Sequence, residues 1–453
     1  MDARTPRPAG AAAALAYRVT VGAGLAATLA ANLPGHLSYD SVIALYEGRT
    51  AIRQTWAPAA YSWILGRFDA LHAGTSLYVT ASALLLYLSL MTLPSLRPRT
   101  SWLAAPVALA AMLTPQLLIY QGIVWKDVLF ANLAVVGFIA LAHAERGWVG
   151  RARIGPLAGA LVCFALAGLV RQNGLVVVAV GAVALAWIAR GGGWRASLVW
   201  GLGGFVAVCV VAVAFDAAVK PVKHVPKLRP EAAARVLQHY DVVGAAAHDP
   251  KLALTDMTPA AAAIVAADAR SVYSAERIDT LGQSPRLGRA LWRTPDAAMS
   301  RQWRDVVLHS PSAYLAHRLA VFDQVLETPA LDRCLPVHVG VIGPPPMIAE
   351  LGLVPEIDVR DQALAAYAAR FFKTPVYSHL TWLLVAVAAG IVLLLRRAPG
   401  DMPMAAMLVG AVGFTASFFV LSVACDYRYL YALDLSAITA LIYLALDPRP
   451  SRR

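Results

Sequence analysis

Long apolar runs separated by short polar segments make up most of the chain. A helix needs about 17–25 consecutive, mostly apolar residues to cross a bilayer. Ten runs reach or approach this length, without an internal repeat: 11–33, 75–94, 102–120, 128–144, 155–170, 174–189, 196–217, 377–395, 403–423 and 429–446. The pattern predicts an all-α polytopic membrane protein with about ten transmembrane helices.

Arginines at the run boundaries orient these helices. If the spans number ten, six groups fall on one side: Arg4 with Arg7, Arg97 with Arg99, Arg146 with Arg151 and Arg153, Arg190 with Arg195, Arg396 with Arg397, and Arg449 with Arg452 and Arg453. Cytoplasmic loops carry an excess of basic residues. We therefore expect this side and both termini to be cytoplasmic, with the first run retained as an uncleaved span.

Segment 56–72 decides the count, because a further span there would move every later basic loop to the opposite side. Its apolar residues recur at helical spacing, and Arg67 and Asp69 lie off that stripe. This amphipathic pattern predicts a helix lying in the membrane interface. With a shorter helix at 41–47, it makes residues 35–74 one external loop on the membrane surface.

Residues 218–376 form the large polar stretch and face outside in this topology. Three Ser/Thr-Pro pairs are typical of an N-cap followed by proline. We expect helices near 231–240, 259–269, 295–308, 311–327 and 360–372, with a loop over 328–347. The chain is thus divided into an N-terminal membrane module (1–217), a mainly helical external segment (218–376) and a C-terminal membrane module (377–453).

Composition supports this class. The 453 residues are 59% hydrophobic and 15% charged, with a mean hydropathy of +0.60, whereas soluble domains are about 45–50% apolar and about 25% charged. The net charge of +12 lies largely in short loops between apolar runs, so the positive-inside rule explains it better than nucleic-acid binding.

The four cysteines form no CxxC motif. Cys163 and Cys209 lie inside apolar runs, where we expect inert packing. Cys334 and Cys425 both lie outside in this topology, and the sequence leaves open whether they pair.

The predicted topology places four polar clusters together on the external face. They are His36 to Ser41 in the first external loop, Trp125-Lys126-Asp127 at the start of the fourth span, Arg171-Gln172-Asn173 between the fifth and sixth, and Cys425 to Tyr429 before the tenth. Charges at span boundaries are costly to place, so these clusters are candidates for function.

Asp40 has two readings that can coexist. It precedes an apolar turn and is suited to cap a helix. A carboxylate at a membrane surface can also act as a general base on an acceptor hydroxyl.

Three external cations, Lys126, Arg171 and Arg428, each stand at a span boundary, and the positive-inside bias disfavours Arg171 and Arg428 there. Lys126 with Asp127 can be a weak local ion pair, and Arg171 can snorkel to the headgroups. The simplest single function for the three cations together is to bind a phosphate at the outer surface.

Asp434 lies about two turns into the tenth span, on one helix face with Tyr427 and Tyr431. An intramembrane carboxylate normally has a partner, and we expect Arg171 or Arg428 in that role. The tyrosines here also suit an aromatic belt at the interface.

This pattern resembles the GT-C membrane glycosyltransferases, in particular bacterial enzymes that modify lipid A, lipopolysaccharide core and O-antigen. Four elements carry the resemblance: Asp40 in a first external loop of two membrane-lying helices; the Trp56-Ala57-Pro58 stretch with Tyr61; Asp127 at the turn from third to fourth span; and an external segment after the seventh span. The metal-dependent members carry Asp-x-Asp-like pairs, which this chain lacks.

The resemblance implies transfer of a sugar from a polyprenyl-phosphate carrier to a glycan, lipid or protein acceptor, on the periplasmic face of the bacterial inner membrane. Asp40 is then the catalytic base, and Lys126, Arg171 and Arg428 bind the donor phosphate. The substrate-binding candidates are Asp127, Asn173, Trp56, Tyr61, Tyr427 and Asp434. No cofactor is expected, with a divalent metal left open.

Two other classes stay in view. A transporter or lipid-linked sugar flippase also needs polar residues in a membrane cavity, but at midplane depth and often with an internal repeat. A non-catalytic envelope assembly protein would use the external segment to dock a partner.

Overall fold

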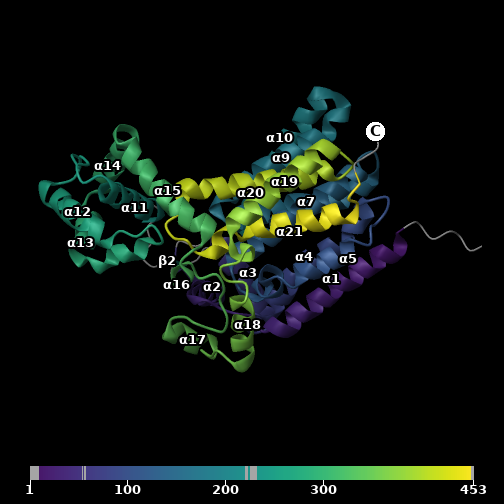
Figure 1. Ribbon diagram of the computed structural model, residues 1–453, viewed down its shortest axis with the longest axis horizontal. Coiled ribbons are helices and arrows are strands. Elements are labelled where there is room, and N and C mark those ends of the chain that lie inside the picture. The colour runs from purple at the N-terminus through teal and green to yellow at the C-terminus, as the bar shows by residue number, and fades with distance from the viewer. Residues whose placement is uncertain (1–9, 54, 56–57, 220–222, 225–231, 450–453) are drawn as a thin grey trace, which may run out of the picture.

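The protein folds into a bundle of long helices with a smaller helical unit at one end (Figure 1). This computed structural model describes residues 10–53, 55, 58–219, 223–224 and 232–449. Within them the structure is all-α apart from one two-residue strand pair, and it is an all-α polytopic membrane fold.

Eight segments within the described residues are long and apolar enough to span a membrane. Six contain one long helix each: α1 (Ala11–Asn32), α4 (Ser76–Thr92), α7 (Lys126–Arg146), α8 (Ile154–Val170), α19 (His379–Arg396) and α20 (Asp401–Leu421). The seventh contains α21 (Tyr431–Leu446), and the eighth runs over Gln172–Ala218.

The predicted third span is broken. Helix α5 (Ala104–Met112) is followed by α6 (Pro115–Leu118) and a short 3-10 turn, with a bend of 70° between the two parts. Proline lacks the N–H that would continue a helix. The segment still traverses the bundle, because a Cβ at Gly10, before α1, would meet Thr100, whereas one at Gly122 would meet Asn32, at the end of α1.

The segment Gln172–Ala218 is a hairpin of α9 (Leu175–Ile188) and α10 (Gly193–Ala218). The two helices fold back on each other, since the Ser197 hydroxyl donates to the Ala186 carbonyl at 2.7 Å. A Cβ at Gly204 would contact Leu185 in the same way. Eight segments pass the test for a span, or nine with the broken one; with the hairpin counted as two passes, the described helices are compatible with the ten that the apolar runs predict.

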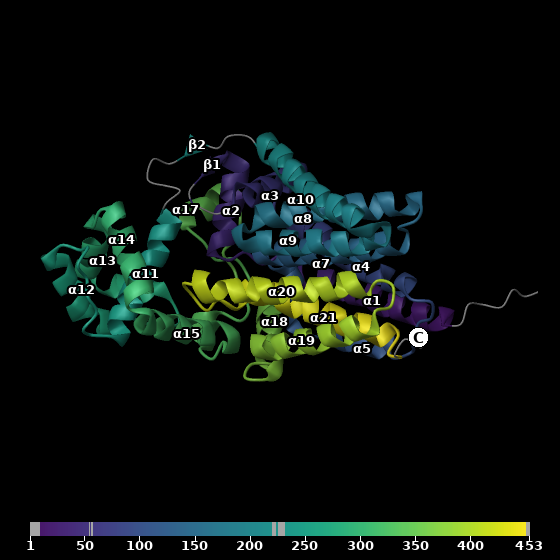
Figure 2. The same ribbon diagram turned by 90° about the horizontal axis from the view of Figure 1, so that it is seen from above.

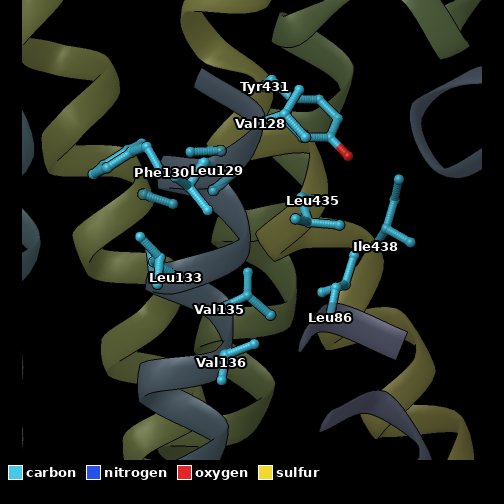
Figure 3. Packing of buried hydrophobic residues seen from close by; sticks show 14 of the residues in the cluster. Leu86, Val128, Leu129, Phe130, Leu133, Val135, Val136, Tyr431, Leu435 and Ile438 are labelled. Atoms are coloured by element: carbon cyan, nitrogen blue, oxygen red, sulfur yellow. The ribbon is translucent and has the colours of Figure 1, made fainter. Parts of the chain in front are cut away.

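Helices α7 and α21 form the centre of the bundle. In their apolar windows 89% and 83% of residues are buried, against 11% in the α9–α10 hairpin at the periphery. Figure 3 shows their packing, with Val135 of α7 pointing toward Leu435 of α21. Bulky aliphatic side chains at helical spacing account for this interface.

The bundle has two chemically different ends. At the basic end, Arg97 and Arg396 both pair with Asp401, and the Ser101 amide donates to the Leu446 carbonyl at 2.7 Å. Helix α21 ends near this point (Figure 1). The opposite end, here called the loop end, carries the external loop and the polar segments. The side of the membrane that each end faces stays a prediction.

The segments predicted to be external keep the names first external loop and external segment. The first external loop contains the two expected short helices, α2 (Tyr39–Thr50) and α3 (Ala59–Leu71), packed against each other. Strand β1 (Ile52–Arg53) lies between them and pairs in parallel with β2 (Lys223–His224). The loop is thereby joined to the start of the external segment (Figure 2).

The external segment has two parts. Helices α11 (Ala232–His248), α12 (Pro259–Val272), α13 (Pro285–Arg293), α14 (Asp296–His309) and α15 (Pro311–Glu327) enclose a hydrophobic core of their own. We call them the helical subdomain. Helices α16 (Leu331–Cys334), α17 (Pro345–Leu351) and α18 (Val359–Ala369) contribute instead to the core of the bundle. The prediction missed α13, and the loop expected over 328–347 is wrong where α16 and the start of α17 lie.

Candidate functional site

Asp40 lies at the start of α2, facing the segment that precedes α21. The N-cap of α2 is Ser38, and Asp40 is the second helical residue, so the interpretation of Asp40 as the cap is wrong. The indole of Trp125 donates to the Ser38 hydroxyl at 2.8 Å and fixes this helix start. Because Asp40 does not cap its own helix, its carboxylate can interact with residues of other segments.

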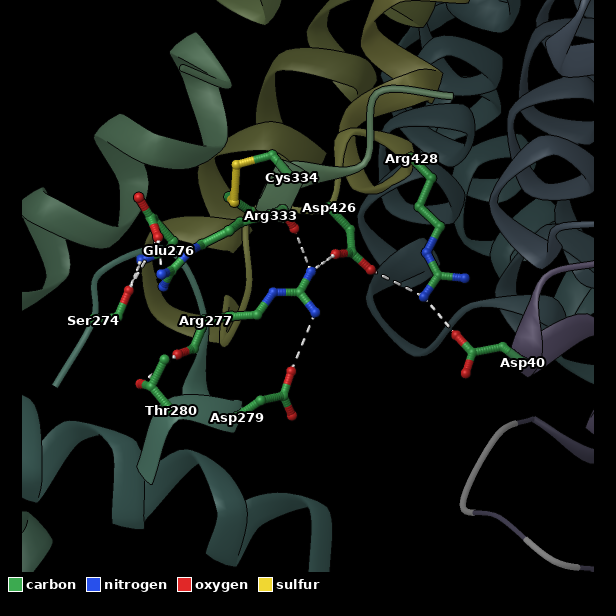
Figure 4. A network of polar contacts seen from close by, with 11 residues as sticks. Asp40, Ser274, Glu276, Arg277, Asp279, Thr280, Arg333, Cys334, Asp426 and Arg428 are labelled. Carbon is green, nitrogen blue, oxygen red and sulfur yellow. Dashed lines mark hydrogen bonds and ion pairs between the residues drawn. A yellow bond between two sulfur atoms is a disulfide. The ribbon is translucent and has the colours of Figure 1, made fainter. Parts of the chain in front are cut away.

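Arg428 connects the polar clusters. It lies in a 3-10 turn, Tyr427–Leu430, between α20 and α21. Its guanidinium donates to Asp40 at 2.5 Å and to Asp426 at 3.1 Å, and its Nε lies 4.0 Å from Asp127 Oδ2. Figure 4 shows Asp40 and Asp426 on either side of it. The rings of Trp125 and Tyr429 also lie within cation–π distance, at 5.3 and 5.7 Å.

The Asp40 side chain remains 64% exposed although it pairs with Arg428. Partial desolvation raises the pKa of its carboxyl. The charge and hydrogen bond of Arg428, followed by the charge of Lys126, outweigh that effect and hold the pKa below its ordinary value. Asp40 is therefore an accessible, ionised carboxylate, which is the state that a general base requires.

Arg171 and Asp127 form a buried ion pair. Both side chains are nearly inaccessible, and the Arg171 guanidinium lies over Phe418 at 5.1 Å. Its Nε donates to the Asn173 side chain at 3.1 Å, and that amide donates to Ser417 at 3.0 Å. Arg171 thus neither snorkels to headgroups nor offers an uncompensated charge, and Asp127 pairs with it rather than with Lys126.

Lys126 is the cation without a counter-charge at contact distance. Among the described residues no carboxylate lies within 4.0 Å of its ammonium, although the charges of Asp40, Arg171 and Arg428 all act on it. Of the three cations predicted to bind phosphate, the structure leaves this one available.

Asp434 is engaged elsewhere, so its predicted pairing with Arg171 or Arg428 is wrong. Its carboxylate is fully buried and contacts His379 Nδ1 at 2.7 Å, and the Tyr427 hydroxyl donates to it at 2.7 Å. His379 Nε2 also lies 3.0 Å from the Tyr427 carbonyl, and Gln116 donates to the Tyr427 hydroxyl. Asp434, His379, Tyr427 and Gln116 therefore bond to one another in a buried polar cluster next to Arg428, here called the closed cluster.

Two further candidates lie in the first external loop. Tyr61 is buried in α3 and packs edge-on against Tyr78, with ring centroids 6.2 Å apart. Trp56 lies outside the described residues.

Two features of this region were not predicted: Arg277 was missed, and the pairing of Cys334 with Cys425 was left open. Arg277 donates to Asp426 at 2.5 Å, which extends the ion-pair chain beyond Arg428 (Figure 4). Cys334 and Cys425 form a disulfide next to Asp426. Nothing distinguishes Arg277 from the many other arginines of the polar segment. For His379, a histidine at the start of an apolar run was a usable signal.

Comparison with known proteins finds no matching family model and no matching curated protein. Among solved structures, the archaeal oligosaccharyltransferase AglB from Archaeoglobus fulgidus, in complex with an inhibitory peptide and a dolichol-phosphate, is 15% identical over 98% of this chain and 47% of that chain, with a TM-score of 0.35. An oligosaccharyltransferase structure from the same organism, with Zn and sulfate, is 14% identical over 97% and 45%, also at 0.35. The chain spans about half the length of these structures.

Proposed function

We propose that the chain is a GT-C-type membrane glycosyltransferase, which moves a sugar from a polyprenyl-phosphate carrier to an acceptor hydroxyl with inversion at the sugar carbon. One observation carries the proposal: an exposed, ionised Asp40 stands within electrostatic range of Lys126, an ammonium without a carboxylate at contact distance. A base and a phosphate-binding cation are the two groups that this transfer needs. The reaction takes place at the loop end, on the periplasmic side of the bacterial inner membrane, with both termini cytoplasmic.

In the proposed step, the acceptor oxygen attacks the sugar carbon from the face opposite the phosphate. The acceptor proton passes to Asp40 as the new bond forms. The bond between the sugar carbon and the phosphate oxygen breaks, and its electron pair leaves with polyprenyl phosphate. The leaving group gains one negative charge while Asp40 loses one.

Arg428 links these two charge changes. Before transfer its guanidinium is held by Asp40 and Asp426. When Asp40 takes up the proton, one of those negative charges disappears, and the positive charge of Arg428 becomes available to the leaving phosphate. Lys126 supplies the attraction that is present from the start, because preformed charges stabilise developing negative charge without reorganisation.

Asp127 and Asn173 have supporting roles in this proposal. The buried pair of Asp127 with Arg171 lies beside Arg428, whose Nε is 4.0 Å from Asp127 Oδ2.

The position of the polar groups also separates an enzyme from a flippase. These groups gather at the loop end of the bundle, whereas a transporter places its binding groups near the midplane. This arrangement favours the enzyme over a flippase.

The test is transfer of a labelled sugar from a polyprenyl-phosphate donor into an envelope fraction by the purified protein in lipid nanodiscs. Asp40→Asn should lower kcat by a factor of about 10²–10⁴, the usual contribution of a general base. The matched control is Asp323→Asn, an exposed carboxylate on α15, which should keep wild-type activity. Full activity in a correctly folded Asp40→Asn protein would refute the role of Asp40.

A further inference from the structure

A polar groove lies where the helical subdomain meets the segment around α16. Its volume is about 310 Å³, at the lower end of the range for small-ligand sites, about 300–1,000 Å³. Leu335 is its one apolar lining residue among those described, and the others are Arg277, Asp279, Thr280, Gln283, Asp332 and Arg333. Such a lining does not suit a lipid tail, because burying these polar groups against hydrocarbon would leave them without partners.

The charges of the groove are balanced, which argues against an anionic ligand. Arg277 is paired with Asp426 at 2.5 Å and with Asp279 at 3.2 Å. Arg333 is paired with Glu276 at 3.0 Å. The remaining capacity is for hydrogen bonds: carboxylates accept, guanidinium groups donate, and the Gln283 amide does both. The Thr280 hydroxyl donates to the Arg277 carbonyl at 3.1 Å and can still accept. Interspersed donors and acceptors with no excess charge match a neutral, polyhydroxylated molecule.

The groove is connected to Asp40 through three ion pairs. Arg277 binds Asp426, Asp426 binds Arg428, and Arg428 binds Asp40 (Figure 4). The wall of the groove is also fixed by backbone hydrogen bonds: the Ile278 amide donates to Val423 at 2.9 Å, and the Cys425 amide donates to Glu276 at 2.8 Å.

The Cys334–Cys425 disulfide joins the opposite wall to the same segment. Both walls are therefore held in a fixed relation to the turn that carries Arg428.

We propose that this groove binds the acceptor, that the acceptor is a neutral glycan, and that one sugar unit sits in the groove while the reacting hydroxyl extends toward Asp40. This inference rests on the proposed function and adds the chemical class of the acceptor. Thr280 and Gln283 are its specificity-determining residues, because their side chains are uncharged and border the groove.

The experiment uses the full chain in nanodiscs, a labelled polyprenyl-phosphate sugar, and the neutral glycan fraction of envelopes from cells that lack the chain. The double variant Thr280→Val/Gln283→Leu should raise the acceptor KM about tenfold, the effect of losing two neutral hydrogen bonds. It should leave kcat and the donor KM unchanged. The matched control is Thr255→Val/Gln362→Leu, at two exposed positions outside the groove lining, which should keep the wild-type acceptor KM.

Three outcomes overturn the inference, and they are distinguishable. An unchanged acceptor KM in the groove variant, with Asp40→Asn inactive, removes the groove while the proposed function stands. Competition by inorganic phosphate against the acceptor, relieved by Arg333→Gln, identifies an anion site instead. No transfer by the wild-type protein into the neutral fraction refutes the neutral acceptor, and the proposed function falls with it only if the whole envelope fraction accepts no sugar either.

Discussion

Arg428 and Asp40 are 388 positions apart in the chain, and their side chains meet at 2.5 Å. Arg428 precedes the last helix of the bundle, whereas Asp40 lies in the first turn of the first helix of the external loop. The contact therefore joins the C-terminal helices to the first external loop. It also sets the protonation state of Asp40, because Arg428 provides the main attraction that lowers the pKa of this carboxyl.

The pH profile of transfer tests this control. Because a base must be deprotonated, kcat/KM falls as the pH drops through the pKa of Asp40. In the wild type this acid limb should lie below the ordinary carboxyl value, since the pKa of Asp40 is lowered. Arg428→Gln removes the lowering charge and leaves the desolvation that raises the pKa. The acid limb should then move to higher pH, measured as kcat/KM against pH.

The control for this shift is Arg190→Gln, an exposed arginine at the basic end of the bundle. Its acid limb should coincide with that of the wild type. An Arg428→Gln limb that does not move would show that Asp40 is not the titrating base.

Substitutions of Lys126 and Arg171 should have different effects, the first on donor binding and the second on stability. Lys126→Gln removes the available cation. A hydrogen bond to a charged group contributes about 1.5–3 kcal/mol, so the donor KM should rise about 10- to 100-fold. Its thermal stability should stay near that of the wild type. Arg171→Gln instead leaves Asp127 buried without its partner, which should lower stability by about 3–5 kcal/mol. Donor KM and unfolding measurements on both variants separate the two roles.

The double variant Arg171→Gln/Asp127→Asn sharpens the comparison, because it removes both buried charges together. It should recover much of the stability that Arg171→Gln loses. Equal instability of the single and double variants would contradict the buried-pair interpretation.

Much of the fold was predictable because the bilayer imposes strong rules on sequence. The apolar runs located the spans, and the amphipathic stripe in 56–72 located α3. Proline at 115 is visible in the sequence and marks where the third span is broken, but the 70° angle between the two parts cannot be read from a proline alone. Helix α13 was missed in the polar segment, where the apolar signal is weak.

The site was predictable only in part, because its partners come from tertiary contacts. Lys126, Arg171 and Arg428 stood out as external cations at span boundaries, and the positive-inside bias disfavours the two arginines there. Which carboxylate each one meets could not be read from spacing: Asp434 binds His379 and Tyr427 instead of an arginine. The pairing of Cys334 with Cys425 likewise required the fold, since spacing alone does not determine connectivity.

The Cys334–Cys425 disulfide should support both stability and catalysis. It closes a separation of 91 residues next to Asp426. Replacing both cysteines by alanine should therefore lower stability by about 2–4 kcal/mol and reduce kcat, because the turn carrying Arg428 loses a constraint. Reductant should lower the Tm of the wild type and leave the double variant unchanged. The control is Cys163→Ala/Cys209→Ala, which removes the free cysteines; a reductant effect lost in that control would contradict the assignment.

The closed cluster beneath Arg428 should act on stability and not on substrate binding. Asp434 contacts His379 Nδ1 at 2.7 Å and accepts a hydrogen bond from the Tyr427 hydroxyl at 2.7 Å, and all three side chains are buried. Asp434→Asn replaces one carboxylate oxygen by an amide group that cannot accept, which leaves a buried donor without its partner and should cost about 1–3 kcal/mol of stability. Donor and acceptor KM should stay unchanged in the folded fraction. A rise in either KM without loss of stability would return Asp434 to the substrate site.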